Sequence, residues 1–400
     1  MINYKEIKSF IQDTIIPKEK DWVGKPFYSI ESELNTFRNI VKQNNWWTPQ
    51  LDKDSGGLGL TLSEHAKLLE ILGMTPFGCY LFNSHAPDAG NMELLEMAGN
   101  KKQKEEYLKP LVNGDIRSCF AMTEPDLAGS NPVRMGTIAV KEGDNYIING
   151  KKWFTTAADG SKFTIVMAVT NDENENPYAK SSMIIVPTNA KGYTIERNIS
   201  IMGHANEGWF SHSEITFKNV KVPITNLLGN EGEGFKLAQK RLGPGRIHHC
   251  MRWMGICERA FDMMCERAIT RKISDTEYLG DKQLVQDFIA VSRAEIDAAK
   301  LYIIDTANKM ETLGHKEARL QISAVKFYAA GVLQKVVDRS IQVHGALGTT
   351  DDTILSFFYR EERGARIYDG ADEAHKTALA KRILKEKKKK NINLIEKNGY

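Results

Sequence analysis

The chain has 400 residues, of which 42% are hydrophobic, so it can bury a large core and form two or three structural units. A formal net charge of +3 is nearly balanced and argues against nucleic acid or a membrane surface as a partner. The N-terminal MINYKEIKSF lacks the apolar region of a signal peptide, and no apolar run reaches the roughly 18 residues of a membrane span. We therefore expect a soluble, cytoplasmic protein.

The five cysteines are an odd number, and none belongs to a Cys-x-x-Cys pair. This pattern argues against a disulfide framework and is typical of a reducing compartment. Cys250, Cys257 and Cys265 recur on one face of a predicted helix. Small core residues explain that spacing better than a metal site, and we predict no metal ligand.

Residues 1–116 are predicted to form an all-α N-terminal domain. Apolar residues recur at helical spacing from Tyr4 to Ile15. Thr61 and Glu64 form a capping-box pattern at the start of a further amphipathic run.

Residues 117–228 change to short runs that alternate with turn signals, a pattern typical of strands. Seven short strands in this length favour a small barrel or sandwich, and we predict a central β-barrel domain. The predicted strands are Arg117–Thr123, Thr137–Lys141, Tyr146–Asn149, Phe163–Thr170, Ser181–Pro187, Tyr193–Arg197 and His212–Phe217.

Residues 229–400 begin with a flexible hinge, GNEGEG, and then return to helical periodicity. Long amphipathic helices with short links predict a C-terminal four-helix bundle. Lys385–Lys390, with its run of lysines, is predicted to be a solvated helix end. The whole chain is therefore an α+β protein of three domains. The predicted bundle helices are Gly234–Arg271, Leu284–Leu313, Lys316–Gly345 and Arg363–Lys387.

Two segments of the central domain offer groups for a flat polar ligand. Thr123–Ser130 ends a strand and presents hydroxyls and backbone N–H groups that can bind a polar heterocycle or a phosphate, although an ordinary turn has the same composition. Trp153 is followed by Thr155 and could form an aromatic wall with a donor beside it. A tryptophan in a barrel strand is also a common core residue.

Three features of the C-terminal domain are candidates for a ligand site. Arg246 follows Gly-Pro-Gly and could hold an anionic or thioester ligand. His248 and His249 are adjacent and point about 100° apart on a helix, so packing or hydrogen bonding suits them better than a shared metal. Arg271 ends its helix, where it could cap the last carbonyl groups or reach a phosphate.

A further segment, Gln342–His375, has glycines that let a backbone approach a ligand and places Asp369 between Tyr368 and Gly370. A carboxylate beside apolar neighbours can act as a catalytic base, whereas most Asp-Gly pairs are simply turns. From this segment alone the turn is the better interpretation.

Taken in order, these motifs resemble the acyl-CoA dehydrogenase family over nearly the whole chain. Gly56–Leu60 and Gln103–Gly114 resemble its N-terminal helices. Cys119–Pro125 (CFAMTEP) is similar to its flavin signature, and Gly150–Thr155 (GKKWFT) to the strand against the flavin. Val220–Phe235 resembles the entry into the C-terminal bundle. Gly245–Arg252 (GRIHHCMR) resembles the branch whose animal members carry an additional kinase-like domain in front, a domain that we do not expect in this protein.

The resemblance implies an FAD enzyme. Thr155 would lie near flavin N5, Arg271 and Gln342 would reach the FAD of another subunit, and Asp369 would be the catalytic base. The implied FAD-binding residues are Phe120, Met122, Thr123, Gly129, Ser130, Trp153, Thr155, Arg271, Gln342, Gly345, Ala346, Ala371 and Glu373. The implied substrate-binding residues are Ser130, Arg246, Tyr368 and Gly370.

Several positions depart from the commonest family pattern. Asp369 replaces a glutamate, and Gly245 occupies the alternative position of the base, which leaves Asp369 as the only candidate. Ser274-Asp275 replaces an aromatic-glycine pair and is followed by an insertion. Ala371 and Glu373 replace a threonine and a glutamine that contact FAD, so the cofactor shell is expected to differ there.

The implied reaction converts an acyl-CoA to a trans-2-enoyl-CoA, as in fatty acid β-oxidation, with the α-proton removed by Asp369 and the β-hydride passed to flavin N5. Preorganised donors, including the backbone N–H of Asp369, would stabilise the thioester carbonyl. The implied partners are an electron-transfer flavoprotein and further copies of the chain, as a homotetramer or dimer. Two alternatives stay open: a flavin oxidase of the nitroalkane-oxidase type, and a non-catalytic acyl-CoA-binding scaffold.

Overall fold

The structure is a computed structural model that describes residues 2–131 and 133–398, with side chains described as far as residue 389. Contacts divide the chain into two compact units. Unit 1 comprises Met1–Thr61 and Thr75–Gly245, and unit 2 comprises Leu62–Met74 and Arg246–Tyr400. Each unit has its own core and is described separately.

Unit 1 contains short helices before and beside a sheet. The longest, α3, is amphipathic and buries Phe27, Ile30, Leu34 and Val41 on one face. Its helices are α1 (Tyr4–Ser9), α2 (Glu19–Trp22), α3 (Phe27–Gln43), α5 (Gly78–Leu81), α6 (Asp88–Ala98), α7 (Lys101–Gln103) and α8 (Lys109–Asn113), with π-helical turns at Phe10–Ile15 and Lys104–Leu108.

The sheet of unit 1 has eight strands in the order β6-β7-β3-β2-β4-β5-β8, with β1 paired in parallel to β4. The central strand β4 is buried along its whole length. The strands are β1 (Ser118–Ala121), β2 (Ile138–Glu142), β3 (Asn145–Thr156), β4 (Phe163–Val169), β5 (Ser181–Pro187), β6 (Tyr193–Asn198), β7 (His212–Pro223) and β8 (Leu227–Leu228).

Two apolar clusters cover β4. Phe163, Ile165 and Met167 pack with the helix residues Leu95 and Leu111, and the alternate residues of β4 pack within the sheet domain. This period of two follows from the pleat, which points successive side chains to opposite faces. The sheet and the helices therefore share one core on this face of β4. Burial of each large apolar side chain there contributes about 1.5–3 kcal/mol to the free energy of folding.

The prediction of a closed barrel is wrong in this detail. Among the described residues β6 and β8 end the path and do not pair with each other, so the sheet is open. The link between β2 and β4 is a single residue pair, Ile138 with Val169. The two-residue strand β8 was not predicted, because periodicity cannot be recognised in so short a segment.

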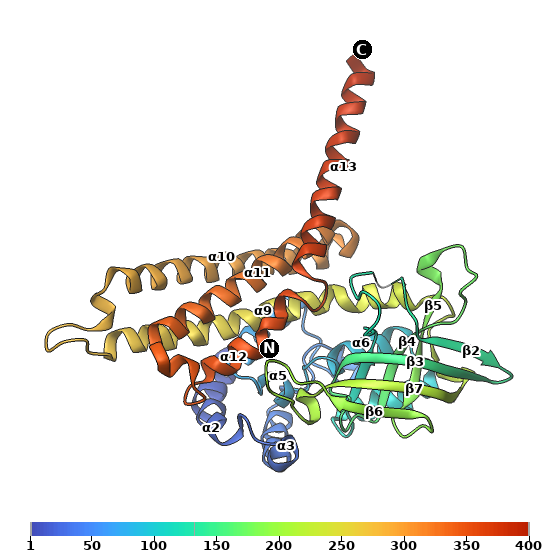
Figure 1. The fold of residues 1–400 in the computed structure, drawn as a ribbon, viewed down its shortest axis with the longest axis horizontal. Helices are drawn as coiled ribbons and strands as arrows, with labels where there is room; N and C mark the ends of the chain where they lie inside the picture. Colours follow the sequence, from blue (N-terminus) through green and yellow to red (C-terminus); the bar gives the residue numbers. More distant parts are fainter. Residues whose placement is uncertain (1, 132, 399–400) are drawn as a thin grey trace. The chain divides into compact units, whose positions relative to one another are not determined.

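In unit 2 the three long helices α9, α10 and α11 lie side by side (Figure 1). Ion pairs and hydrogen bonds connect them. For example, Arg293 of α10 binds Glu258 of α9, and the Ser340 hydroxyl of α11 donates to a carbonyl of α9. The helices are α4 (Leu62–Leu72), α9 (Gly234–Thr270, from Arg246 onward), α10 (Gln283–Leu313), α11 (His315–His344), α12 (Ile354–Glu362) and α13 (Asp372–Asn398).

Two elements of unit 2 differ from the sequence prediction. Helix α4 groups with the C-terminal helices, since Lys300 of α10 bridges Glu70 of α4 and Glu258 of α9. The helix predicted from residue 363 starts at Asp372 instead, after a 3-10 turn at Arg363–Arg366 and the Asp369 turn. Figure 1 shows α13 extending well past the other helices of the unit. Its lysines are exposed as far as side chains are described, as predicted.

Candidate active site

The first group of predicted site residues lies in unit 1, where strand β1 ends. The N–H of Trp153 in β3 donates to the carbonyl of Thr123 at 3.0 Å, which joins the predicted flavin loop to the sheet. Beneath this loop, Lys152 is fully buried. Its Nζ lies 2.8 Å from a carboxylate oxygen of Glu124 and 2.9 Å from the carbonyl of Met122. The loop is therefore anchored from below by a buried ion pair.

Each charge of this pair offsets the free-energy cost of burying the other. Burial lowers the pKa of Lys152 to about 8, although the charge and hydrogen bond of Glu124 act in the opposite direction. Glu124 also accepts the backbone N–H groups of Gly136 and Thr137, at 2.6 and 2.8 Å. A carboxylate that accepts hydrogen bonds from three donors stays ionised, so these bonds hold the loop rigidly in place.

The loop presents its hydroxyl groups outward. Thr123, Gly129 and Ser130 are exposed. A Cβ on Gly129 would stand 3.3 Å from the methyl group of Thr123, which shows that the loop folds back on itself there. Two hydroxyls and neighbouring N–H groups are thus available to a polar ligand on the surface of unit 1.

Trp153 and Thr155 follow on β3 at a β-bulge. The β3–β7 register shifts between Lys152 and Thr155, and Phe154 has φ +48°. Bulges re-aim side chains and are frequent next to ligand sites. Within the described residues, Trp153 Nε1 and Thr155 Oγ1 are both buried and have no hydrogen-bond partner. Such orphaned groups cost about 1–3 kcal/mol each, which a polar heterocycle would recover.

Phe120 carries a cationic neighbour that the sequence did not reveal. The guanidinium of Arg241, on α9, lies 4.3 Å from the centre of the Phe120 ring. Gly90 makes room for it, because a Cβ there would stand 2.8 Å from Arg241 Nε. Burial raises the pKa of the nearby Glu93 to about 7 in spite of Arg241. A single arginine in an amphipathic helix is usually solvated, so periodicity gave no signal for it.

The second group of predicted residues lies in unit 2, at the turn before α13. Asp369 has φ +54° and Gly370 has φ +98°, so both residues of the Asp-Gly pair adopt left-handed backbone conformations, which are uncommon for residues other than glycine but which aspartate tolerates better than most. The carbonyl oxygen of Asp369 accepts Arg246 Nε and His375 Nε2, each at 3.1 Å. The buried Lys326 donates to the carbonyl of Gly370 at 2.7 Å.

These donors hold the backbone and leave the carboxylate of Asp369 partly accessible. That side chain is 21% exposed. Burial, followed by the charge of Arg246, lowers the pKa of His375 to about 4, which keeps the imidazole neutral. A carbonyl can only accept, so Nε2 of His375 carries the proton.

Tyr368, the residue before Asp369, is held by hydrogen bonds of its hydroxyl group. Its hydroxyl accepts Trp253 Nε1 at 3.0 Å and donates to Glu362 at 3.3 Å. Arg252 binds both carboxylate oxygens of Glu362. Tyr368 was predicted to bind substrate, but its hydroxyl group is occupied by this network.

His249 also reaches the base. Its Nε2 lies 3.5 Å from Oδ2 of Asp369, and both side chains are 21% exposed. Its neighbour His248 turns to the interior and lies 3.2 Å from His65 Nδ1 of α4. The sequence analysis gave the two histidines packing or hydrogen-bonding roles, and did not connect either one with Asp369.

The remaining predicted cofactor residues are not gathered at the base. Arg271, Gln342, Gly345, Ala346 and Glu373 are exposed, whereas Ala371 is partly buried beside the turn. The insertion after Arg271 forms a small hairpin, in which Lys272 pairs with Tyr278 and Ser274 accepts two backbone N–H groups. The Gly345–Gly348 segment is a 3-10 helix after α11.

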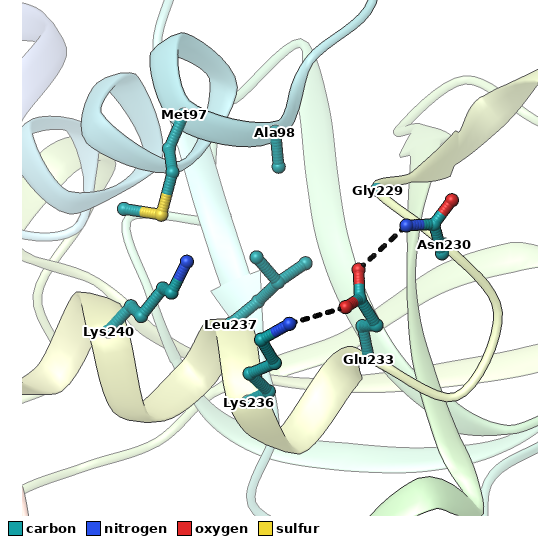
Figure 2. A pocket seen from close by; sticks show the side chains of 8 residues that line it. All are labelled: Met97, Ala98, Gly229, Asn230, Glu233, Lys236, Leu237 and Lys240. Atoms are coloured by element: carbon teal, nitrogen blue, oxygen red, sulfur yellow. Dashed lines mark hydrogen bonds and ion pairs between the residues drawn. The ribbon is translucent and has the colours of Figure 1, made fainter.

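A separate surface pocket of about 330 Å³ lies in unit 1 and contains none of the predicted site residues. Figure 2 shows an ion pair in this pocket: Lys236 binds Glu233, whose carboxylate also accepts a hydrogen bond from Asn230. It is lined by Met97, Ala98, Gly229, Asn230, Glu233, Lys236, Leu237 and Lys240.

Comparison with known proteins shows which family has this order of domains. Models of the N-terminal, middle and C-terminal domains of acyl-CoA dehydrogenases match residues 4–115, 119–220 and 232–384. The chain belongs to the acyl-CoA dehydrogenase family. FadE2 of Mycobacterium tuberculosis, named as an acyl-CoA dehydrogenase, is 39% identical over 97% of this chain and 96% of its own.

Human acyl-CoA dehydrogenase family member 11 is 37% identical over 96% of this chain. The chain spans about half the length of that relative, 50%. A solved Mycobacterium abscessus protein of the acyl-CoA dehydrogenase type has a TM-score of 0.91 at 34% identity and covers 96% of this chain and 97% of its own. Two further solved neighbours of the same fold, at 23% and 22% identity, are acyl-CoA dehydrogenases described with FAD and with FADH2 bound. No helix in the described part of the chain is long and apolar enough to cross a membrane.

Proposed function

We propose that the protein is an FAD-dependent acyl-CoA dehydrogenase that forms a trans-2-enoyl-CoA, with Asp369 as the base. This reaction needs a hydride acceptor and a base. Unit 1 carries groups suited to a flavin, and unit 2 carries a carboxylate on a turn that three side chains hold. The observation that carries the proposal is this turn, in which Arg246, His375 and Lys326 bind the backbone of Asp369-Gly370 and leave the carboxylate accessible.

The residues of unit 1 fit FAD. Thr155 and Trp153 bring buried polar atoms that lack a partner in the described structure, and Thr123 and Ser130 bring exposed hydroxyls. FAD, when bound, supplies the acceptor for the β-hydride at N5. Phe120, Met122 and Gly129 complete the proposed binding surface in unit 1.

The base turn supplies two functions. The carboxylate of Asp369 takes the α-proton of the thioester. The N–H of Asp369 donates no hydrogen bond to the described residues, so it can donate to the thioester oxygen and stabilise the enolate-like charge that develops there. The positive φ of Asp369 matters for both roles, because it sets the direction of this N–H relative to the side chain.

The decisive experiment is anaerobic bleaching of the bound flavin by a panel of acyl-CoAs, in wild type and Asp369→Asn. We expect one acyl-CoA class to bleach the wild type, and the variant to lose at least about 10³-fold in rate, as the loss of a general base predicts. Asp13→Asn, an exposed aspartate in unit 1, is the matched control. Equal bleaching by Asp369→Asn and wild type would overturn the assignment of the base.

Two further parts of the proposal concern partners. We propose that electron-transfer flavoprotein reoxidises the enzyme, and slow reoxidation by O₂ with fast reoxidation by that protein would separate a dehydrogenase from an oxidase. We also propose that Arg271, Gln342, Gly345 and Ala346 serve FAD bound by another copy of the chain in a dimer or tetramer. Their exposure within unit 2 supports this role, and light scattering of the holoenzyme measures the oligomeric state.

A further inference from the structure

Helix α9 contacts both the backbone and the side chain of the proposed base, Asp369. Arg246 and His249 are three residues apart and therefore share a helix face. Arg246 Nε binds the carbonyl oxygen of Asp369 at 3.1 Å, and His249 Nε2 lies 3.5 Å from its carboxylate. One side chain thus holds the backbone of the base, and the other faces the atoms that would take the proton.

The ring of His249 is held in this orientation by aromatic packing. It lies nearly parallel to Trp253, at 26° and 6.1 Å between centres, and against Tyr368 at 5.1 Å. Trp253 Nε1 in turn donates to the hydroxyl of Tyr368 at 3.0 Å. The imidazole therefore packs against two rings, Trp253 and Tyr368, that are joined to each other by a hydrogen bond. A histidine that only filled space would not need its Nε2 directed at a carboxylate.

We propose that His249 is the proton-accepting partner of Asp369, so that the two side chains work as one base. The proposal rests on the proposed dehydrogenase function. Asp369 must be ionised and His249 neutral before the reaction, with the lone pair of Nε2 directed at Asp369. An ionised carboxylate and an unprotonated Nε2 can both only accept, so no hydrogen bond joins them at 3.5 Å before the reaction. The bond forms once Asp369 has taken up the proton and donates it to Nε2.

The proton and electron balance is complete without a new reactant. The α-C–H bond breaks, its proton goes to a carboxylate oxygen of Asp369, and its electron pair forms the Cα=Cβ bond. The β-C–H bond would break with its two electrons leaving as a hydride, which bound FAD would accept. The O–H bond on Asp369 then breaks as an N–H bond forms on His249 Nε2, which leaves an imidazolium beside a carboxylate. An unperturbed imidazolium holds its proton about 400-fold more tightly than an unperturbed aspartic acid, which favours this transfer.

The pair that has not taken up a proton is the active form, and flavin reduction should therefore rise with pH and reach a plateau. Charged and titratable groups on the packed elements affect this pH dependence. They are Arg246, His248 and Arg252 on α9, Glu362 on α12, Tyr368 in the turn, Lys326 on α11 and His375 on α13.

The test compares anaerobic flavin reduction by the best acyl-CoA across pH 5.5–9 in wild type, His249→Gln and His249→Ala. We expect His249→Gln to lower the plateau rate about 10–100-fold, within the range for a positioned acid-base group, and to move the apparent pKa of the profile downward. Imidazole added to His249→Ala should restore part of the rate. His204→Gln, an exposed histidine in unit 1, is the control.

Three outcomes decide the matter. A plateau and a pH profile of His249→Gln equal to those of wild type would overturn the proposal and leave His249 a packing residue. A lower rate without a shifted profile, and without rescue by imidazole, would also overturn it, because misplacement of Asp369 alone produces that result. If no acyl-CoA bleaches the wild type, the dehydrogenase function itself fails, which is a distinct result. His249→Phe, which keeps an aromatic ring between Trp253 and Tyr368, should behave as His249→Gln does.

Discussion

Arg246, His375 and Lys326 bind the backbone carbonyls of Asp369 and Gly370, and we call these three side chains the clamp. Replacement of Gly370 by alanine tests whether the clamp matters for the reaction. Gly370 has φ +98°, and a Cβ at this position would stand 2.7 Å from Nε2 of His375. Ordinary contact begins near 3.4 Å, so the imidazole must retreat by about 0.7 Å. Its hydrogen bond to the carbonyl of Asp369 is 3.1 Å long. A retreat along that line stretches it to about 3.8 Å, which is no longer a hydrogen bond.

The expected cost has two parts. Backbone strain at a positive φ contributes about 1–2 kcal/mol, and the lost hydrogen bond contributes about 1 kcal/mol. We therefore expect Gly370→Ala to lower the free energy of unfolding by about 2–3 kcal/mol. A displacement of the base by a fraction of an ångström to 1 Å should slow flavin reduction by about 10- to 100-fold.

Gly314 provides a control for the strain. It has φ +82° at the junction of α10 and α11, and an added Cβ would meet nothing within 4 Å. Gly314→Ala should therefore lose stability through strain alone and reduce its flavin at the wild-type rate. Urea unfolding and anaerobic stopped-flow measurements on both variants give the two quantities. A Gly370→Ala enzyme that reduces flavin as fast as Gly314→Ala would refute the argument that the clamp positions the base.

Two other predictions concern buried charges. Lys152→Met leaves Glu124 buried without its cation, so this substitution should destabilise unit 1 by about 3–5 kcal/mol and release FAD. Lys151 is exposed on the same strand, and Lys151→Met should do neither. Equal FAD retention by the two variants would contradict the role of the ion pair. Burial lowers the pKa of His248 to about 3, so the folded form resists protonation, and the stability that this provides above pH 6.5 is lost as the pH falls. From pH 7.5 to 5 the free energy of unfolding should drop by about 2 kcal/mol through His248. Urea titrations at both pH values should show a smaller drop for His248→Gln, and an unchanged drop would assign it to other groups.

The sequence by itself determined the elements that local physics controls. The long amphipathic helices of the C-terminal half were placed within one or two residues in three cases, because a period of 3.6 sustained over 30 residues leaves little ambiguity. The strands from Phe163 to Asn198 were placed nearly as well, since β-branched runs between turn signals are distinctive. The order of the motifs was also sufficient to identify the family and the candidate base, Asp369.

Only the tertiary structure decided which side chains meet. Arg246, Lys326 and His375 are far apart in the sequence and converge on two consecutive carbonyl groups, and no periodicity encodes such a convergence. His249 and its neighbour His248 look equivalent in the sequence. The rotation of about 100° per residue turns one toward Asp369 and the other toward the interior. Closure of the sheet was likewise beyond local patterning, because the alternation of strands is the same in an open and a closed sheet.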